Sequence, residues 1–484
     1  MALLALEALT GGLAVVASRL FPTADATALV LISMNALILC SPLLFRAIRR
    51  QFDLLEPTVV FAVAYGVMFV VRPLALLVSG DRIYVRPSRA IDFAYSFEFT
   101  LLLALIGSAT FIIGYAAPWG ASVAARIPRP PRELHPGTAL AGTIATVVVA
   151  IMLFLVFVGT SGGIGVITSF LSGRSPEQTS LFRGSTAYLY TAPYMLIPAT
   201  ILLLTLARIR HDIVLGSLGV LVLFIVLLRA VPMGSRMMLL PLCGGLYVVY
   251  YLRRDRRPSM ASALLLCVII LLGSTILLGV RTASSRGDGG TGDVVRETLS
   301  NPMVVFDPLV SGADTEMVET LAVAVQEIPR TFPYAYGGTV LGDLLIRPIP
   351  RIAWDSKPLS PRERLIGELW PEEYAAGVAN PEFSSLLYYY WDFGALGVAV
   401  GMAVYGLFAR TLFEFWRTNR KLWVAQLFYA LTLPFIVIGL RDSPADTTMR
   451  LAFVLGPLVL IAVLSKRHED ALSSRSEPTL SEAV

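Results

Sequence analysis

Hydrophobic residues in this 484-residue chain form long, nearly uninterrupted runs separated by short polar segments. A helical run of about 18 or more apolar residues can cross a hydrocarbon core about 30 Å thick. Backbone groups inside a membrane must pair within their own segment, so we expect helices and no open sheet. The predicted spans cover residues 3–18, 27–45, 57–79, 93–117, 138–158, 186–207, 213–231, 237–252, 260–281, 386–409, 422–440 and 449–465. The pattern predicts an all-α polytopic membrane protein with about twelve transmembrane helices.

One polar segment is far longer than the other connections. It follows the ninth predicted span and contains enough aromatic and aliphatic residues to form a compact, mostly helical cap on the bundle. The last residues are rich in Ser and Glu, which favours disorder. The sequence thus predicts four regions: helices 1–9 (residues 1–283), a large loop (284–385), helices 10–12 (386–465) and a disordered cytoplasmic tail (466–484).

Composition agrees with a membrane protein and excludes several classes of enzyme. Hydrophobic residues make up 56% of the chain and charged residues only 15%, against about 25% in ordinary soluble domains. The chain has no P-loop, no HExxH and no CxxC motif, and its three cysteines all fall in apolar runs. We therefore expect neither ATP-driven transport nor metalloprotease chemistry. We also expect no cofactor, no metal site and no nucleic-acid partner.

The distribution of Lys and Arg among the loops predicts the orientation of the chain. One alternating set of loops carries 19 basic residues, whereas the other short loops carry 10. Cytoplasmic loops are enriched in Lys and Arg. Both termini are therefore predicted to be cytoplasmic, and the large loop is predicted to be extracytoplasmic.

Several cations nevertheless lie at the predicted outer ends of helices, against the positive-inside trend. They are Arg174, Arg183, Arg229, Arg236, Arg281, Arg347, Arg351, Arg441 and Arg450, with Lys357 nearby. Arginine forms bidentate bonds to phosphate oxygens, so such a group fits a lipid-linked phosphate or diphosphate. The alternative is that each arginine reaches lipid headgroups or pairs with an acidic side chain.

Two segments near the end of the large loop combine aromatic and ionisable residues. Residues 347–358 contain three prolines, three cations and Trp354, a stiff segment able to hold an anion and stack a sugar ring. Residues 384–397 contain Tyr388, Trp391 and Asp392 at the start of the tenth span. They fit either an interfacial aromatic belt or a carbohydrate platform with Asp392 near the reaction centre. For residues 347–358, the alternative is a structural turn at the membrane surface.

Four motifs, in this order along the chain, resemble those of the bacterial O-antigen polymerase family, the oligosaccharide repeat-unit polymerases. They are Asp53-x-x-x-Pro57 followed by Arg72-Pro73; Gly234-Ser235-Arg236; Ile349-Pro350-Arg351 with Trp354 and Lys357-Pro358; and Phe393-Gly394-x-x-Gly397 followed by Arg441-Asp442. The resemblance implies a GT-C-like membrane glycosyltransferase in the bacterial inner membrane. Its donor and acceptor would both be oligosaccharides linked to polyprenyl (undecaprenyl) diphosphate, used for O-antigen, capsule or exopolysaccharide in the cell envelope.

In that reaction a sugar hydroxyl of the acceptor attacks the donor, and polyprenyl diphosphate leaves. The resemblance implies diphosphate binding by Arg236, Arg351 and Arg441, followed by Arg174, Arg347 and Lys357. The acids considered as catalytic base are Asp392, Asp355 and Glu368, and the aromatic residues considered for sugar binding are Trp354, Tyr388 and Trp391. Membrane lipid and a chain-length regulator protein are the further partners expected.

Other functions remain open from the sequence. An O-antigen ligase is expected to use a histidine in the outer loop, but His135, His211 and His468 all fall on the predicted cytoplasmic side. A mannosyltransferase-type enzyme would have acidic residues in a large first outer loop, which is short here. A lipid-oligosaccharide flippase would carry charges in mid-span and internal repeats. A non-catalytic assembly partner is the last alternative.

Overall fold

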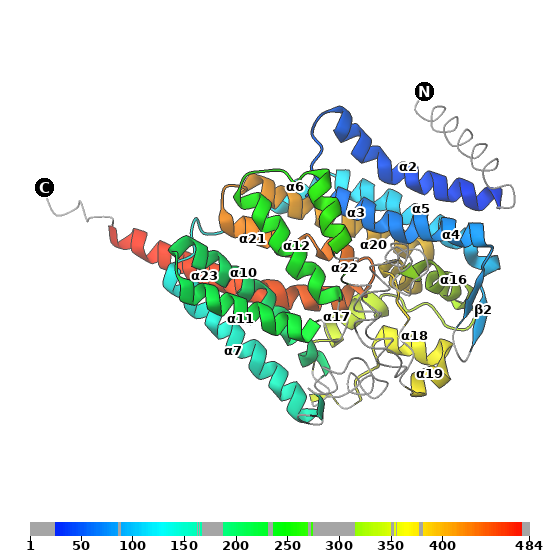
Figure 1. The fold of residues 1–484 in the computed structure, drawn as a ribbon. Coiled ribbons are helices and arrows are strands. Elements are labelled where there is room, and N and C mark those ends of the chain that lie inside the picture. Colours follow the sequence, from blue (N-terminus) through cyan, green and yellow to red (C-terminus); the bar gives the residue numbers. More distant parts are fainter. Residues whose placement is uncertain are drawn as a thin grey trace, which may run out of the picture.

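The computed structural model describes residues 25–85, 89–161, 163, 165–166, 187–230, 236–269, 273, 315–349, 353–354, 356–376 and 381–476. These residues form a bundle whose long helices run between two ends of the molecule (Figure 1). Eight helical segments are long and apolar enough to cross a membrane: Ala26–Ile48, Pro57–Ser79, Ala94–Ala116, Pro136–Thr160, Leu189–Arg210, Ile213–Ala230, Ser385–Thr418 and Pro444–His468. Each coincides with a predicted span, so the chain has the helices of a polytopic membrane protein.

Three shorter apolar helices occupy the positions of three more predicted spans. They are Met237–Arg253, Met260–Ile269 and Trp423–Ile438. The predicted span at residues 3–18 lies outside the described residues, so the total of about twelve stays a prediction.

The long helices begin where the sequence supplies a helix start. Asp25 caps α2, accepting a hydrogen bond from the backbone N–H of Thr27 at 2.9 Å, and Pro57 and Pro136 occupy the first turns of α3 and α7. Up to α12, the helical elements are α2 (Ala26–Ile48), α3 (Pro57–Gly66), η1 (Val67–Val71), α4 (Arg72–Ser79), α5 (Ala94–Ala116), α6 (Trp119–Arg126), α7 (Pro136–Thr160), η2 (Ala187–Met195), α10 (Leu196–Arg210), α11 (Ile213–Ala230) and α12 (Arg236–Arg253). The later ones are α16 (Met317–Glu327), η4 (Gly338–Gly342), α17 (Asp343–Ile346), α18 (Pro361–Leu369), α19 (Pro371–Ala376), α20 (Ser385–Thr418), α21 (Trp423–Thr432), α22 (Phe435–Ile438) and α23 (Pro444–Ser476).

Helices α5 and α20 approach each other at the level of the backbone. A Cβ atom added to Gly114 would lie 2.0 Å from the carbonyl oxygen of Ala403, and one added to Gly406 would lie 2.0 Å from that of Phe111. Small residues allow membrane helices to pack this closely, where van der Waals contact replaces the hydrophobic drive available in water. The α5–α20 pair therefore forms a close-packed centre of the bundle.

Within the described ranges, the only paired strands form one short hairpin. Strands β1 (Ile83–Val85) and β2 (Ala90–Asp92) pair antiparallel. The buried ring of Tyr84 in β1 packs edge-on against that of Trp370, with centroids 5.7 Å apart. The all-α prediction missed this hairpin because strands of three residues carry too little alternation to be recognised.

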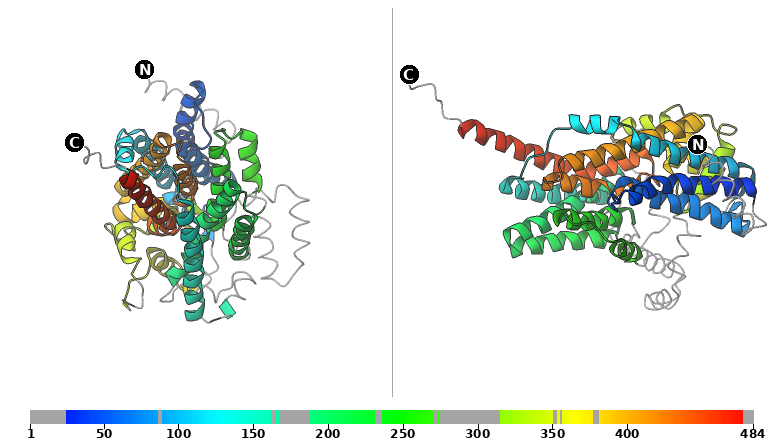
Figure 2. Two further views of the ribbon diagram at one scale, coloured as in Figure 1. Left: turned by 90° about the vertical axis from the view of Figure 1, so that its left-hand side faces the viewer. Right: turned by 90° about the horizontal axis from the view of Figure 1, so that it is seen from above.

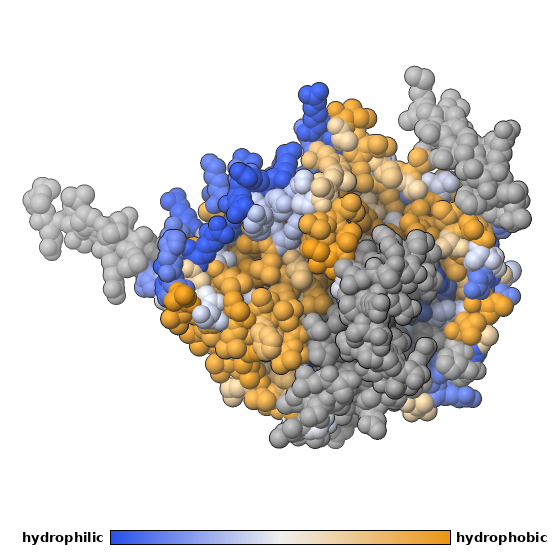
Figure 3. Space-filling view, in the orientation of Figure 1, coloured by the Kyte–Doolittle hydropathy of each residue, from blue (hydrophilic) through white to orange (hydrophobic). Residues whose placement is uncertain are grey.

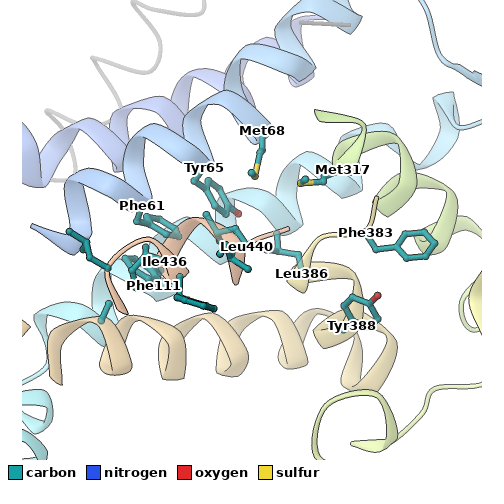
Figure 4. Packing of buried hydrophobic residues seen from close by; sticks show 14 of the residues in the cluster. Phe61, Tyr65, Met68, Phe111, Met317, Phe383, Leu386, Tyr388, Ile436 and Leu440 are labelled. Atoms are coloured by element: carbon teal, nitrogen blue, oxygen red, sulfur yellow. The ribbon is translucent and has the colours of Figure 1, made fainter. Parts of the chain in front are cut away.

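The described helices of the large loop share their core with the membrane bundle. Figure 4 shows Met317 of α16 and Phe383 in the same packed group as Tyr65 and Phe111 of the bundle. Residues 317–324 of α16 are all buried, and Ser96 of α5 donates a hydrogen bond to the carbonyl of Ala322 at 2.8 Å. Helix α16 is therefore built into the bundle and does not rest on top of it.

The basic loops predicted to be cytoplasmic lie close to one another at several points. Arg46 and Arg410 face the same Tyr115 ring, at 5.7 and 5.5 Å from its centroid. Loop residues 129–132, 417–422 and Lys466 line one cavity, and the rings of His135 and His468 lie 4.1 Å apart.

Figure 3 shows hydrophobic surface on the flank of the bundle and hydrophilic residues along its upper left rim. In Figure 2, α23 extends beyond the other helices. We call the end of the molecule that carries the basic loops of the preceding paragraph the basic end.

Candidate functional site

The segment just before α20 joins several parts of the large loop. The backbone N–H of Glu382 donates to the side chain of Glu316, which precedes α16, at 3.0 Å. Arg362 of α18 donates to the carbonyl of Pro381 at 2.9 Å. Side chains and backbone from α16, α18 and α20 are thereby held together at the end opposite the basic end.

The turn between α22 and α23 brings two arginines to the same place. Arg441 lies 3.7 Å from a carboxylate oxygen of Glu382, and Arg450 contacts the carboxylate of Asp442. The backbone N–H of Asp446 donates to the Ser443 hydroxyl at 3.0 Å, a local bond at the start of α23. Asp442 of this turn therefore holds Arg450, while Glu382, just before α20, lies beside Arg441.

A third arginine reaches this turn from the large loop. Arg347 follows α17 and contacts the carboxylates of both Asp343 and Asp446. Burial alone would lower the pKa of Arg347, but these two carboxylates outweigh it and raise that pKa. The ammonium of Lys357 donates to the carbonyls of Arg347 and Ile349 at 3.0 and 2.8 Å, which places Lys357 beside the end of α17.

These groups form one charged cluster. Arg450 interacts electrostatically with Arg362, Arg347 and Glu382, and the Tyr388 phenol lies within reach of Arg362 and Arg347. The cationic cluster, as we call it, consists of Arg347, Lys357, Arg362, Arg441 and Arg450, and its acidic neighbours are Asp343, Glu382, Asp442 and Asp446.

Among the residues predicted to bind diphosphate, the structure brings together Arg441, Arg347 and Lys357. Arg174 and Arg351 lie outside the described residues, as does the side chain of Arg236. Besides these three residues, the cationic cluster contains Arg362 and Arg450, which were not among the residues predicted to bind diphosphate.

Asp392, one of the acids predicted as a base, is engaged with the backbone. Its carboxylate oxygens accept hydrogen bonds from the N–H groups of Thr339 at 2.9 Å and Val340 at 3.2 Å. The buried carboxylate therefore caps the first turn of η4 and holds the segment that leads to Arg347. Glu368 is exposed on α18, and Asp355 lies outside the described residues.

A break in α20 explains why Asp392 can turn toward η4. Phe393 and Gly394 depart from helical geometry, and Gly394 has φ +62°. The carbonyls of Trp391 and Asp392, freed by the break, accept hydrogen bonds from the N–H groups of Ala335 at 2.9 Å and Tyr336 at 3.1 Å. A broken helix is tolerated at membrane depth when neighbouring segments satisfy its backbone in this way.

The residues predicted to bind sugar occupy different environments. Tyr388 is 1% exposed and Trp391 is 3% exposed, and the Trp391 indole donates to the carbonyl of Pro333 at 3.2 Å. Both rings pack in the core of the protein. Trp354 is partly exposed and donates to the Ser356 hydroxyl at 3.0 Å, so its face lies nearer the surface than the other two.

The acidic partners of the cluster were missed at the level of sequence. A signal was present in Arg441-Asp442-Ser443-Pro444-Ala445-Asp446, where two acids surround a helix start beside an arginine. Asp343 stands four residues before Arg347, the spacing of a helical ion pair. Glu382 had no such local signal, because Arg441 lies in another segment.

The cationic cluster can bind a polyanion by letting the anion replace carboxylates as the partner of its arginines. Within the described residues no group of three or more His, Cys, Asp or Glu side chains is arranged to hold a metal ion. Comparison of the chain with protein-family models, with curated proteins and with solved structures finds no match in any of the three.

Proposed function

We propose that the chain is a membrane glycosyltransferase that polymerises oligosaccharide repeat units linked to polyprenyl diphosphate, on the outer side of the bacterial cytoplasmic membrane. The observation that carries this proposal is the convergence of Arg347, Arg441 and Arg450 at the end opposite the basic loops. Clustered ionisable groups at a membrane end are expensive and mark a functional site.

The cluster has the properties expected of a site for a leaving diphosphate. Its arginines are held in place before substrate arrives, so little reorganisation is needed when negative charge develops on the leaving group. The contact between Arg441 and Glu382 measures 3.7 Å, longer than a hydrogen bond. Arg441 is also one of the residues that the sequence predicts to bind diphosphate.

The proposed reaction needs one proton acceptor. The acceptor hydroxyl oxygen forms a bond to the anomeric carbon of the donor, and the bond from that carbon to the diphosphate oxygen breaks with its electron pair. The hydroxyl proton passes to a carboxylate. Among the described acids we favour Glu382, since it adjoins Arg441 and its side chain is 19% exposed. Asp392 takes a positioning role in this scheme, while Asp355 and Glu368 stay as alternatives.

Two observations favour a polymerase over the main rivals. A ligase of the kind considered above needs a histidine near its substrate, whereas His135 and His468 lie next to each other at the basic end. A flippase needs charges along its path in mid-membrane. The ion pairs Arg46–Glu56 and Arg410–Glu414 lie around Tyr115 at the basic end. Of the described pairs, Arg72–Glu319 does place a charge inside a candidate span, and its two side chains are mostly buried against each other.

The test is polymerisation by the purified full-length protein in nanodiscs, supplied with polyprenyl-diphosphate-linked repeat units. Products are resolved by length for the wild type, Arg441→Ala, Arg441→Lys and the matched control Arg330→Ala. Arg330 is an exposed arginine that lies 5.7 Å from the Tyr95 ring, outside the cluster. We expect a ladder of lengthened products, reduced at least about tenfold in Arg441→Ala and unchanged in the control.

The other outcomes identify the rival functions. Consumption of donor only when a separate acceptor such as lipid A is added would indicate a ligase. Unchanged donor that crosses a vesicle bilayer with the protein would indicate a flippase. Equal ladders from Arg441→Ala and the wild type would remove the cationic cluster from the proposal.

A further inference from the structure

Two adjoining cavities begin at the basic end, and one of them extends along α23 as far as Leu451, which follows Arg450 of the cationic cluster. The first has a volume of about 370 Å³ and an almost entirely apolar lining. It lies between α20, α21 and α23, where Phe408, Phe428, Leu451 and Leu455 contribute to its wall. We call it the apolar groove.

The apolar groove opens toward the flank of the bundle. Phe408, Val459 and Val463 on its wall are 39%, 45% and 46% exposed. These residues belong to α20 and α23, both long enough to span a membrane. Acyl chains of the surrounding bilayer therefore have direct access to the groove.

The second cavity has a volume of about 640 Å³ and a strongly basic lining. Its cations come from the loop after α6, the loop between α20 and α21, and the end of α23. They are Arg129, Arg132, Arg417, Arg420, Lys421 and Lys466. No acidic residue is among the described residues that line it. We call it the basic pocket.

Most of these cations have no carboxylate partner in the described part of the chain. Arg417 pairs with Glu414 at 2.8 Å, whereas Lys466 reaches only the carbonyl of Arg129, at 3.5 Å. In residues 127–132, Pro128, Pro130 and Pro131 restrict the backbone that carries two of the arginines. The basic pocket is thus lined by cations that are largely uncompensated in the described part of the chain, two of them on a stiff backbone.

The two cavities adjoin each other. Arg129, Pro130, Pro131 and Lys466 line both of them. A ligand that fills both must have an anionic head and an apolar tail. From this juxtaposition we propose that the basic pocket and the apolar groove together bind one anionic glycerophospholipid, with its phosphate among the cations and an acyl chain between α20, α21 and α23.

The positive-inside rule explains why cations are numerous at this end. It does not explain why six of them line one cavity that adjoins an apolar groove. A soluble phosphate compound would use the basic pocket alone, and a neutral lipid would use the groove alone. This site is independent of the proposed glycosyltransferase activity, since it shares no residue with the cationic cluster.

The test is native mass spectrometry of the full-length protein, delipidated in detergent and titrated with phosphatidylglycerol or phosphatidylcholine of the same acyl chains. The pocket variant replaces three exposed cations, Arg129→Gln, Arg132→Gln and Arg420→Gln. The matched control removes the same charge at exposed positions of other basic loops, Arg208→Gln, Arg210→Gln and Arg256→Gln. A third variant, Leu455→Trp, fills the groove. Thermal unfolding of each variant in the same detergent shows whether it is folded.

We expect phosphatidylglycerol to bind at least about tenfold more tightly than phosphatidylcholine. The pocket variant should lose that preference, the control should keep it within about twofold, and Leu455→Trp should weaken phosphatidylglycerol binding.

Equal binding of the two lipids, or equal loss in the control, would overturn the proposal. If glycerol 3-phosphate binds as tightly as the lipid and Leu455→Trp has no effect, the pocket binds a free phosphate instead. A variant that fails to fold is replaced by its single substitutions, each of which removes one of the exposed cations.

Discussion

Arg347, at the end of α17, contacts the carboxylate of Asp446 in the first turn of α23, 99 positions later in the chain. The contact connects the large loop to the final helix of the bundle. Arg347 also contacts Asp343. One guanidinium thus holds together two segments beside the cationic cluster, α17 and the start of α23.

Replacing Asp446 should therefore loosen the cluster without removing a cation. In Asp446→Asn, Arg347 keeps Asp343 but loses a charge-assisted bond, so we expect a loss of about 1 to 3 kcal/mol in the free energy of unfolding. The rate of polymerisation should also be lower in this variant than in the wild type. Thermal unfolding in detergent and the product-ladder assay measure the two effects. Thr448→Ala, an exposed neighbour on α23, serves as the control, and equal behaviour of the two variants would contradict the bridging role.

The pair between Arg72 and Glu319 predicts a non-additive double substitution. The Arg72 Nε donates to a carboxylate oxygen of Glu319 at 2.8 Å, and both side chains are mostly buried, at 13% and 4% exposed. Removing one partner of a buried ion pair takes the opposite charge away from the other, at a cost of about 3 to 5 kcal/mol. We expect large destabilisation from Arg72→Met or Glu319→Leu alone and partial recovery in the double variant.

A double-mutant cycle on thermal or denaturant unfolding measures this coupling. Additive losses would show that the pair does not join α4 to α16 energetically. The Arg89–Glu327 pair is a useful comparison, since Arg89 is 47% exposed and exposed pairs contribute little.

The break in α20 predicts a strong dependence on Gly394. Its φ of +62° disfavours any residue with a Cβ, and an added Cβ would also lie 3.3 Å from the Tyr334 hydroxyl. Gly394→Ala should therefore destabilise the protein by about 1 to 2 kcal/mol. It should also reduce activity, because the break orients Asp392 toward η4.

Gly80 provides the matched control for this substitution. It has φ +71° but no atom within 4 Å of an added Cβ, and it ends α4 at a surface turn. Gly80→Ala carries the same backbone penalty without the contact or the link to η4. It should lower the melting temperature yet leave the rate of polymerisation unchanged. Unchanged activity in Gly394→Ala would show that the break is not needed to form the site.

Asp343 predicts a dependence of stability on pH. Burial raises the pKa of its carboxyl, Arg347 opposes that rise and Asp446 adds to it. The folded protein therefore holds the proton more tightly than the unfolded chain does. The stability that this group contributes is full below its unfolded pKa of about 3.9 and is lost as pH rises through the folded value.

The Asp343→Asn variant has no carboxyl group at this position, so its stability does not depend on this titration. We expect the melting temperature of the wild type, relative to Asp343→Asn, to fall as the pH is raised from acid toward neutral. Melting curves at a series of pH values measure the difference. A constant difference would mean that the carboxyl has the same proton affinity in both states.

Much of the fold was predictable because a membrane imposes a simple rule on the sequence. Runs such as Pro136–Thr160 must be helical and must be long enough to span, so length and apolar content alone identify them. The loops with most Lys and Arg could be assigned to one side for a similar reason. The structure brings several of them together around Tyr115 and the basic pocket.

The site was only partly predictable. Sequence reasoning found Arg441, Arg347 and Lys357, since a cation at the outer end of a helix opposes a general trend and is visible without a structure. It could not find Glu382 as the neighbour of Arg441, nor Asp446 as that of Arg347. Such pairs form between segments whose approach is determined by packing.

By itself the sequence determined that this chain is a bundle of membrane helices with a charge asymmetry, because solvation by a bilayer acts on each segment independently. Only the tertiary structure decided that α16 is buried in the bundle, that Asp392 caps η4 and that five cations meet. The physical reason is that such contacts depend on distances between segments far apart in the chain. Those distances result from side chains packing into a single shared core.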